Sequence, residues 1–310
     1  MEASEYFQQL VDRTVALVVD DVEAAAMGRS LGFPVTLFDE YSFSEKQERP
    51  ALVVITQTAS IPRLHALWGQ AAAPFCHLAL AKFDGSPASL SYALRRLLSA
   101  DAATALSRRA DTYEQMLSCQ DLEITTTAGV LHCHLRDELE IPNSGDEIQP
   151  GWLYSIAEFF EASVVNLEEE RSSFWVEGDF ACDGLIYLCN SAELKARFAP
   201  QLDDVLHRVA TAGATLRFTD NRIDRIRVGG EDVTESFLAL LRGLERESAV
   251  TELGIGCSKF GTPIEGGRNV VLHKSELGVY IGIGKGLHIP HIDFVSRNAQ
   301  LRYLPTPSAA

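Results

Sequence analysis

Runs of hydrophobic residues alternate with amphipathic stretches over the first 118 residues. Continuous apolar runs predict buried strands at residues 14–19, 35–38, 51–55 and 75–81. Helices are predicted from Asp20 or Asp21 to Gly32, over 61–73, and from Ser86-Pro87 onward, where a capping residue precedes proline at the first helical position. Because strands alternate with helices, we predict an α/β domain with a largely parallel sheet.

The pattern changes near Cys119, after which strands and glycines predominate. Residues 123–127 and 130–135 flank Gly129 and predict a hairpin. Further strands are predicted at 185–188, 215–218 and 223–228, and helices at about 152–162, 193–211 and 232–244. We therefore predict an α/β domain over 1–118, a strand-rich α+β domain over 119–304 built on a curved sheet or an open barrel, and a frayed tail over 305–310.

The composition describes a globular, acidic chain. Hydrophobic residues make up 46% and charged residues 23%, and 27 basic against 43 acidic residues give a net charge of −16. Such a charge repels nucleic acids and anionic membranes, so neither is an expected partner. No apolar run is long enough to span a bilayer, the first residues lack a signal peptide, and the six cysteines form no CxxC pair. We expect a cytoplasmic protein with reduced cysteines.

Three segments near the C-terminus, at 251–256, 276–284 and 288–294, alternate between polar and apolar residues as strands do. Residues two apart on a strand share a face, so His291 and Asp293 project together. By the same rule Glu252 shares its face with two glycines. An imidazole and two carboxylates form a plausible set of ligands for zinc, manganese or iron. The sequence thus indicates a candidate metal site formed by Glu252, His291 and Asp293.

The same alternation places Tyr280 on one face with Gly282 and Gly284. Glycines beside a phenol leave open space over a sheet, where a ligand could bind. The three segments resemble the ELGIG, HIAIG-like and HxD motifs of the thermophilic-type metallo-aminopeptidases. The resemblance covers residues 120–300, with a looser match before them. It implies an aminopeptidase-like fold, a homodimer, and two metal ions held by two glutamates, two histidines and an aspartate.

Two departures from that family affect the expected metal site. Tyr280 stands where the family has a histidine, and the segment from Gly151 leads to Glu158 or Glu161 where the family has a Gly-Glu motif. An intact two-metal site is therefore not expected. A single-metal site, assisted by His288 or His273, and a metal-free cleft are the alternatives.

An aminopeptidase-shaped cleft can bind an extended peptide through the backbone of glycine-rich strand edges. In size and general character the chain is also similar to the peptide-binding proteins of crocagin biosynthesis. This resemblance implies a protein that binds a precursor peptide during maturation of a ribosomally synthesised, post-translationally modified peptide. A metal-dependent aminopeptidase and a single-metal peptide-modifying enzyme are the alternatives. The candidate cleft residues are Tyr280, Gly282, Gly284, His288, Phe174, Trp175 and Glu158.

Other patterns do not point to a further site. The glycines of 282–286 lack the helix and the hydroxyl residue of a phosphate-binding loop. His132 and His134 share a strand face, but no third ligand follows at a suitable spacing. No GxSxG motif is present, and Cys257 is more typical of a buried hydrophobic residue than of a nucleophile.

Overall fold

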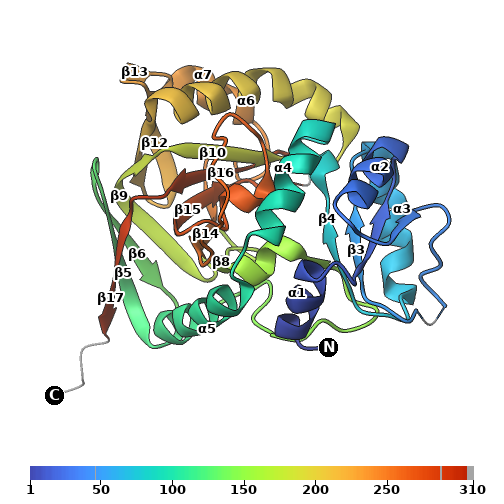
Figure 1. The fold of residues 1–310 in the computed structure, drawn as a ribbon. Coiled ribbons are helices and arrows are strands. Elements are labelled where there is room, and N and C mark those ends of the chain that lie inside the picture. The colour runs from blue at the N-terminus through green and yellow to red at the C-terminus, as the bar shows by residue number, and fades with distance from the viewer. Residues whose placement is uncertain (46, 287, 306–310) are drawn as a thin grey trace.

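The computed structural model describes residues 1–45, 47–286 and 288–305, which form one parallel and two antiparallel sheets (Figure 1). The parallel sheet has the order β2-β1-β3-β4-β7. Its strands are β1 (Ala16–Val19), β2 (Val35–Leu37), β3 (Ala51–Val54), β4 (Phe75–Leu78) and β7 (Tyr154–Ser155). The first four coincide with the predicted apolar runs, and every pair is parallel, so the predicted α/β sheet is confirmed.

Helices surround this sheet, and two of them begin at the predicted capping residues. They are α1 (Ala3–Val11), α2 (Val22–Ser30), α3 (Ile61–Leu67) and α4 (Pro87–Leu98), whereas α5 (Ala102–Leu117) packs against α1 and the second half of the chain. The Asp21 carboxylate accepts hydrogen bonds from the backbone N–H of Glu23 and of Ala24, at 2.8 and 3.0 Å. The Ser86 hydroxyl accepts one from the N–H of Ser89 at 3.3 Å. These hydrogen bonds satisfy backbone N–H groups of the first turn, which have no partner within the helix.

The second half of the chain forms two antiparallel sheets. The seven-stranded sheet comprises, in order, β13 (Glu231–Asp232), β12 (Arg222–Val228), β11 (Ala214–Thr219), β9 (Phe174–Cys182), β6 (Gly129–Leu135), β5 (Cys119–Thr126) and β17 (Gln300–Pro305). The five-stranded sheet comprises β10 (Gly184–Leu188), β16 (His291–Ser296), β15 (Gly278–Ile283), β14 (Val250–Gly256) and β8 (Glu161–Val165). The hairpin of β5 and β6 is confirmed.

Helices α6 (Ala192–Ala212) and α7 (Thr234–Leu241) confirm two predicted helices, but the helix predicted at 152–162 is wrong. Strand β7, a short 3-10 helix η4 (Ile156–Phe160) and the start of β8 occupy that segment. Ile156, Phe159 and Phe160 in this segment are buried, and a short continuous apolar run does not distinguish a helix from strands. The other 3-10 helices are η1 (Thr58–Ser60), η2 (Trp68–Gln70), η3 (Leu80–Lys82) and η5 (Val271–His273).

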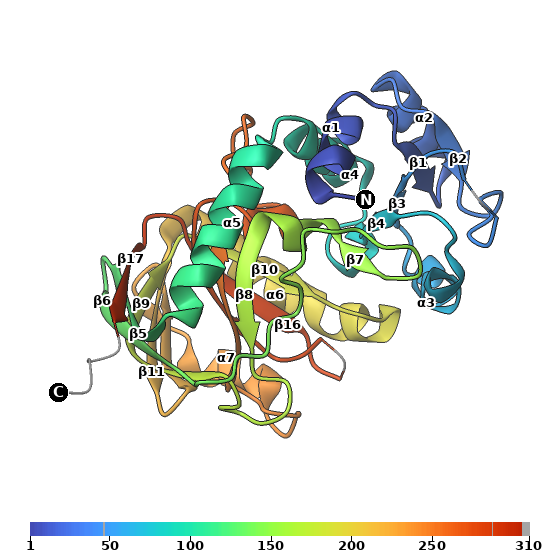
Figure 2. The same ribbon diagram turned by 90° about the horizontal axis from the view of Figure 1, so that it is seen from below.

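One hydrophobic core fills the space between the two antiparallel sheets and helices α6 and α7. Leu253, Ile281 and Phe294 of the five-stranded sheet point into it. The opposite face of that sheet is turned toward the parallel sheet, where Ile186 joins a second core with Leu52. Figure 2 shows β7 beside β4, shortly before β8 in the chain. The five-stranded sheet therefore presents one face to each half of the chain.

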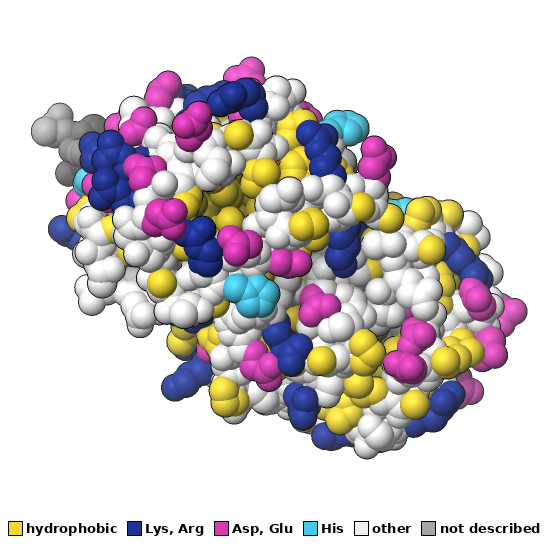
Figure 3. All heavy atoms as spheres, turned by 90° about the horizontal axis from the view of Figure 1, so that it is seen from above, with side chains coloured by type: hydrophobic (Ala, Val, Ile, Leu, Met, Phe, Trp, Pro, Cys, Tyr) yellow, Lys and Arg dark blue, Asp and Glu magenta, His cyan; other side chains and the backbone are white. Residues whose placement is uncertain are grey.

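The parallel sheet receives β7 from beyond residue 118, and the domain limits 1–118 and 119–304 stay a prediction. Of the predicted tail, Pro305 ends β17 and residues 306–310 lie outside the described residues. Among the helices that the structure describes, none has the length and apolar character needed to cross a bilayer. On the face in Figure 3, acidic and basic side chains are interspersed.

All six cysteines are free and buried. Burial raises the pKa of Cys257 to about 11, and its thiol donates a hydrogen bond to the carbonyl of Ile255 at 3.4 Å. The thiolate is the nucleophilic form of cysteine. Cys257 is therefore kept in its unreactive state.

His273 is a buried histidine that packs against helix α4. The Tyr92 hydroxyl lies 2.9 Å from its Nε2 atom, and the two rings meet edge to face at 5.6 Å. Burial lowers the pKa of His273 to about 3, with further contributions from the charges of Arg96, Arg297 and Arg268. The folded protein thus holds this ring neutral.

Stability is expected to fall with acid because of His273. In the unfolded chain the ring takes up a proton near pH 6.5, whereas in the folded chain it does so only near pH 3. The unfolded state is therefore favoured progressively as pH falls between these values, by up to about 1.4 kcal/mol per pH unit. In urea unfolding at pH 7, 5 and 4, the free energy of unfolding should depend less steeply on pH for His273→Gln than for the wild type. The exposed His288→Gln serves as control, and equal slopes for His273→Gln and wild type would contradict the prediction.

Candidate functional site

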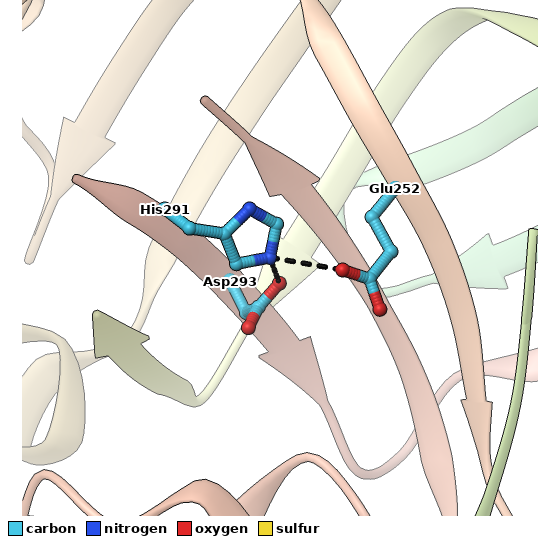
Figure 4. Close-up of side chains that lie close together, drawn as sticks. All are labelled: Glu252, His291 and Asp293. Atoms are coloured by element: carbon cyan, nitrogen blue, oxygen red, sulfur yellow. Dashed lines mark ion pairs between the residues drawn. The ribbon is translucent and has the colours of Figure 1, made fainter. Parts of the chain in front are cut away.

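The candidate site lies across the three central strands of the five-stranded sheet. In their register, Glu252 of β14 lies opposite Gly282 of β15, and Gly282 lies opposite Asp293 of β16. Directly opposed residues are about 5 Å apart, so the two carboxylates stand on either side of a glycine. His291 precedes Asp293 by two residues and shares its face, as Figure 4 shows. The predicted common face of these side chains is confirmed.

The ligand atoms of these three side chains converge. His291 Nε2 lies 3.0 Å from Glu252 Oε2 and 2.9 Å from Asp293 Oδ1, and one ligand atom from each residue falls within 4.8 Å of the others. His291 Nδ1 donates a hydrogen bond to the Gly284 carbonyl at 2.7 Å. When the ring is neutral, this bond leaves the lone pair on Nε2, the atom that faces the carboxylates, as in metal-binding histidines.

Two of these atoms are buried without a hydrogen bond. Within the described residues, neither His291 Nε2 nor Asp293 Oδ1 has a partner of suitable geometry. A Cβ atom added to Gly282 would lie 2.6 Å from Asp293 Oδ1, 2.8 Å from His291 Cε1 and 3.0 Å from Glu252 Cβ. The space over Gly282 is thus enclosed by all three side chains. Their donor set fits one divalent zinc, manganese or iron ion.

A lysine that no sequence pattern singles out completes the cluster. Lys274 follows η5, and its Nζ atom lies 3.1 Å from Glu252 Oε1, 3.4 Å from Glu161 Oε1 and 3.8 Å from Asp293 Oδ2. The ammonium also lies 4.6 Å from the centre of the Tyr280 ring. Lys274 belongs to no alternating strand segment, so its place in the site depends on the tertiary fold.

The charges of the cluster shift the pKa values of its members. Burial alone would raise the pKa of Glu252, but Lys274 and His291 outweigh it and hold the pKa well below its usual value. Burial alone would lower the pKa values of His291 and Lys274, but the neighbouring carboxylates raise both well above their usual values. In the absence of a metal ion, Glu252 and His291 therefore form a charged pair.

Glu161 and Glu158 were the two candidates for the displaced glutamate, and the structure places both at the site. Glu161 begins β8, contacts Lys274 and is buried, and this burial raises its pKa to about 8. Glu158 belongs to η4, and burial raises its pKa to about 7. Neither approaches His291 as Glu252 and Asp293 do, so the candidate metal ligands are unchanged.

Tyr280 lies beside the candidate metal ligands as a hydrogen-bond donor. Its hydroxyl donates to Glu252 Oε1 at 2.7 Å, and burial raises the pKa of the phenol well above its usual value. Its ring covers Gly254, where an added Cβ would lie 2.0 Å from the Tyr280 Cζ atom. The glycine therefore makes room for the ring, and Tyr280 orients Glu252.

A pocket of about 340 Å³ opens over this cluster, between the two halves of the chain. Glu158 and Gly284 line it together with the three candidate metal ligands. Tyr280 and Gly282 are buried within the sheet beneath these candidate ligands. His77 and Lys82 reach it from the parallel half, and Lys274 and Lys285 from the other.

The structure does not bring every predicted cleft residue to this pocket. His288 is exposed in the connection between β15 and β16. Phe174 is buried in the core between the antiparallel sheets, and Trp175 stacks on His134 with ring centres 4.7 Å apart. Both aromatic residues belong to β9 of the seven-stranded sheet, whereas the pocket lies on the far face of the five-stranded sheet.

Fold and site together describe a mixed α/β protein with a carboxylate and imidazole cluster at the base of a pocket. Residues 12–304 match the family model of the crocagin biosynthetic protein CgnE/B. Because the match spans most of the chain, the protein belongs to this family, and the expected similarity to crocagin biosynthetic proteins is confirmed. None of the curated proteins matches its sequence.

Two solved structures are similar over nearly the whole chain. The 2,5-dihydroxypyridine dioxygenase from Pseudomonas putida KT2440 has a TM-score of 0.50 and 14% identity, over 98% of this chain and 94% of that one. AmpT from Thermus thermophilus, an aminopeptidase, has a TM-score of 0.47 and 11% identity, over 97% of this chain and 96% of that one. At 14% identity, the likeness to the dioxygenase concerns the fold alone.

Proposed function

We propose that this protein binds the precursor peptide of a crocagin-type pathway in the pocket between its two halves. Membership of the crocagin biosynthetic family supports a role in peptide maturation. The observation that carries the proposal is the pocket itself, which combines aliphatic walls with a base of buried carboxylates. Ligand pockets commonly join apolar walls to a few fixed polar groups, the first for affinity and the second for orientation.

The mouth of the pocket supplies apolar surface for a peptide. Leu167 lines the pocket and is 55% exposed, and Trp152, 58% exposed, precedes the lining residue Leu153. Large exposed apolar side chains at a concave site are typical of binding surfaces, and aromatic residues contribute strongly to binding energy. A peptide can therefore place one side chain inside the pocket and others against this rim.

Recognition depends on side chains rather than on strand addition at the glycines. Strand β15, which carries Gly282, pairs with β14 on one side and β16 on the other. Its backbone groups are thus engaged within the sheet. The expectation that glycine-rich strand edges would hydrogen-bond the peptide is corrected accordingly, since these glycines provide space over an internal strand.

The converging atoms of Glu252, His291 and Asp293 favour a second candidate function, a metal-dependent aminopeptidase or a single-metal peptide-modifying enzyme. A divalent ion held there would supply Lewis-acid chemistry to a bound peptide. Glu252 is oriented for this purpose by Tyr280, and His291 by the Gly284 carbonyl. The homodimer implied by the aminopeptidase resemblance stays a prediction.

Peptide binding can be tested by isothermal titration with a synthetic precursor peptide encoded beside this protein. We expect saturable binding with a Kd of about 10 µM or tighter, and at least about tenfold weaker binding for the double variant Trp152→Ala, Leu167→Ala, since about 1.4 kcal/mol corresponds to a factor of ten. Leu117→Ala, which removes a similarly exposed side chain on α5, is the matched control. Absence of saturable heat with the wild-type protein would refute peptide binding, whereas release of free amino acids would favour the aminopeptidase.

A further inference from the structure

Glu252 and Asp293 each face two different cationic positions. Glu252 directs Oε2 toward His291 and Oε1 toward Lys274, at 3.0 and 3.1 Å. Asp293 likewise directs Oδ1 toward His291 at 2.9 Å and Oδ2 toward Lys274 at 3.8 Å. Both carboxylates therefore bridge the candidate metal position and the ammonium of the lysine. This bridging is the arrangement that carboxylates adopt between two metal ions.

Carboxyl groups surround the Lys274 ammonium beside the ring of Tyr280. Glu161 adds a third at 3.4 Å, and its second oxygen, Oε2, is buried without a hydrogen bond within the described residues. A cage of carboxylate oxygens is a donor set that binds divalent ions. The same oxygens would hold a metal ion if the ammonium were absent.

The backbone around Lys274 keeps the ammonium in this cage. The N–H of Ser258 donates to the Ser275 carbonyl at 3.0 Å, and the N–H of Leu277 donates to the Ser258 carbonyl at 2.8 Å. Gly256 permits this approach, because a Cβ there would lie 2.8 Å from the Lys274 carbonyl oxygen. The segment carrying Lys274 is thus fixed against the end of β14.

We propose that the Lys274 ammonium takes the place of a second metal ion, so that the site holds one divalent ion beside one fixed positive charge. Glu252 and Asp293 bridge the two. An ammonium offers no open coordination position, so it neither binds a water molecule as a nucleophile nor polarises a carbonyl as a metal ion does. The site is therefore suited to binding a ligand. It lacks the second metal ion that hydrolysis by a two-metal mechanism requires. This inference rests on the metal site of the second candidate function and is independent of peptide binding.

Metal stoichiometry tests the proposal directly. Wild type, Lys274→Ala and Lys285→Ala would each be loaded with Mn²⁺ or with Zn²⁺, freed of excess ion, and measured by elemental analysis against protein concentration. We expect one ion per chain for the wild type and two for Lys274→Ala, in which the removed side chain leaves the carboxylate cage open. Lys285 also lines the pocket but contacts Glu245, so Lys285→Ala should retain one ion. Two ions or none in the wild type, or fewer than two in Lys274→Ala, overturns the proposal.

A second measurement tests the proposal even if Lys274→Ala does not fold in the absence of metal. Thermal unfolding of this variant should shift upward with Mn²⁺ by more than the wild type does, because the added ion replaces the lost charge. Lys274→Met fills the space without a charge and should bind no more than one ion. An equal shift for Lys274→Ala and Lys274→Met overturns the proposal. Titration of the metal-free wild-type protein with the precursor peptide measures peptide binding separately, so a failure of that function can be distinguished from a failure of this proposal.

Discussion

Replacing Gly282 by alanine is expected to abolish divalent metal binding, with the Kd for Zn²⁺ rising by at least about 100-fold, or about 2.7 kcal/mol. The added methyl group would lie 2.6 Å from Asp293 Oδ1 and within 3.0 Å of atoms of His291 and Glu252. It would therefore occupy the space that the three ligands enclose. Ligand atoms must approach an ion to about 2.0–2.2 Å, which a methyl group between them prevents.

Competition with a chromophoric chelator measures this change in affinity for zinc. Gly69→Ala is a matched control, because an added Cβ at Gly69 meets no atom within 4 Å. Urea unfolding of both variants separates a local effect on the site from loss of the fold. If Gly282→Ala binds Zn²⁺ as tightly as the wild type, the ion does not lie over this glycine, and the candidate metal site is wrong.

The face on which the ligands lie could be predicted because strand alternation is local. His291 and Asp293 are two residues apart, and Ile292 between them points into the opposite core. Bringing Glu252 opposite Gly282 requires the register between strands, which alternation restricts without determining. Gly282 pointed to the site, because a glycine beside polar residues leaves open space over a sheet, where a ligand can bind.

The remaining parts of the site depend on contacts that no local pattern encodes. Lys274 reaches the carboxylates from a connection after a 3-10 helix, and its three partners lie far from it in the sequence. Strands of both antiparallel sheets show the same alternation, so the sequence did not reveal that Phe174 and Trp175 belong to the sheet away from the pocket. The fold class followed from periodicity, whereas the assignment of strands to sheets depended on the tertiary structure.

Asn166→Leu is expected to lower the free energy of unfolding by about 3–5 kcal/mol. Leucine has a similar size but cannot make the four hydrogen bonds of the buried asparagine side chain. Asn166 follows β8 and is fully buried. Its amide donates to the carbonyls of Phe174 and Val250, at 3.0 and 3.2 Å. Its Oδ1 accepts from the N–H groups of Ser173 and Phe174, at 2.9 and 3.1 Å. Leucine removes all four bonds, and the Val250 carbonyl keeps the bond that it accepts from the Asn221 amide at 3.2 Å.

The same substitution should also weaken peptide binding. Asn166 connects strand β8, which carries Glu161, to Leu167 at the mouth of the pocket, and its hydrogen bonds tie this connection to β9 and β14. Urea unfolding measures the loss of stability, and titration with the precursor peptide measures binding under conditions in which the variant is folded. Asn298→Leu changes an exposed asparagine in a turn and should alter neither quantity. A loss of stability below about 1 kcal/mol for Asn166→Leu would show that neighbouring groups or water replace the four bonds, and that the pocket mouth is held by other contacts.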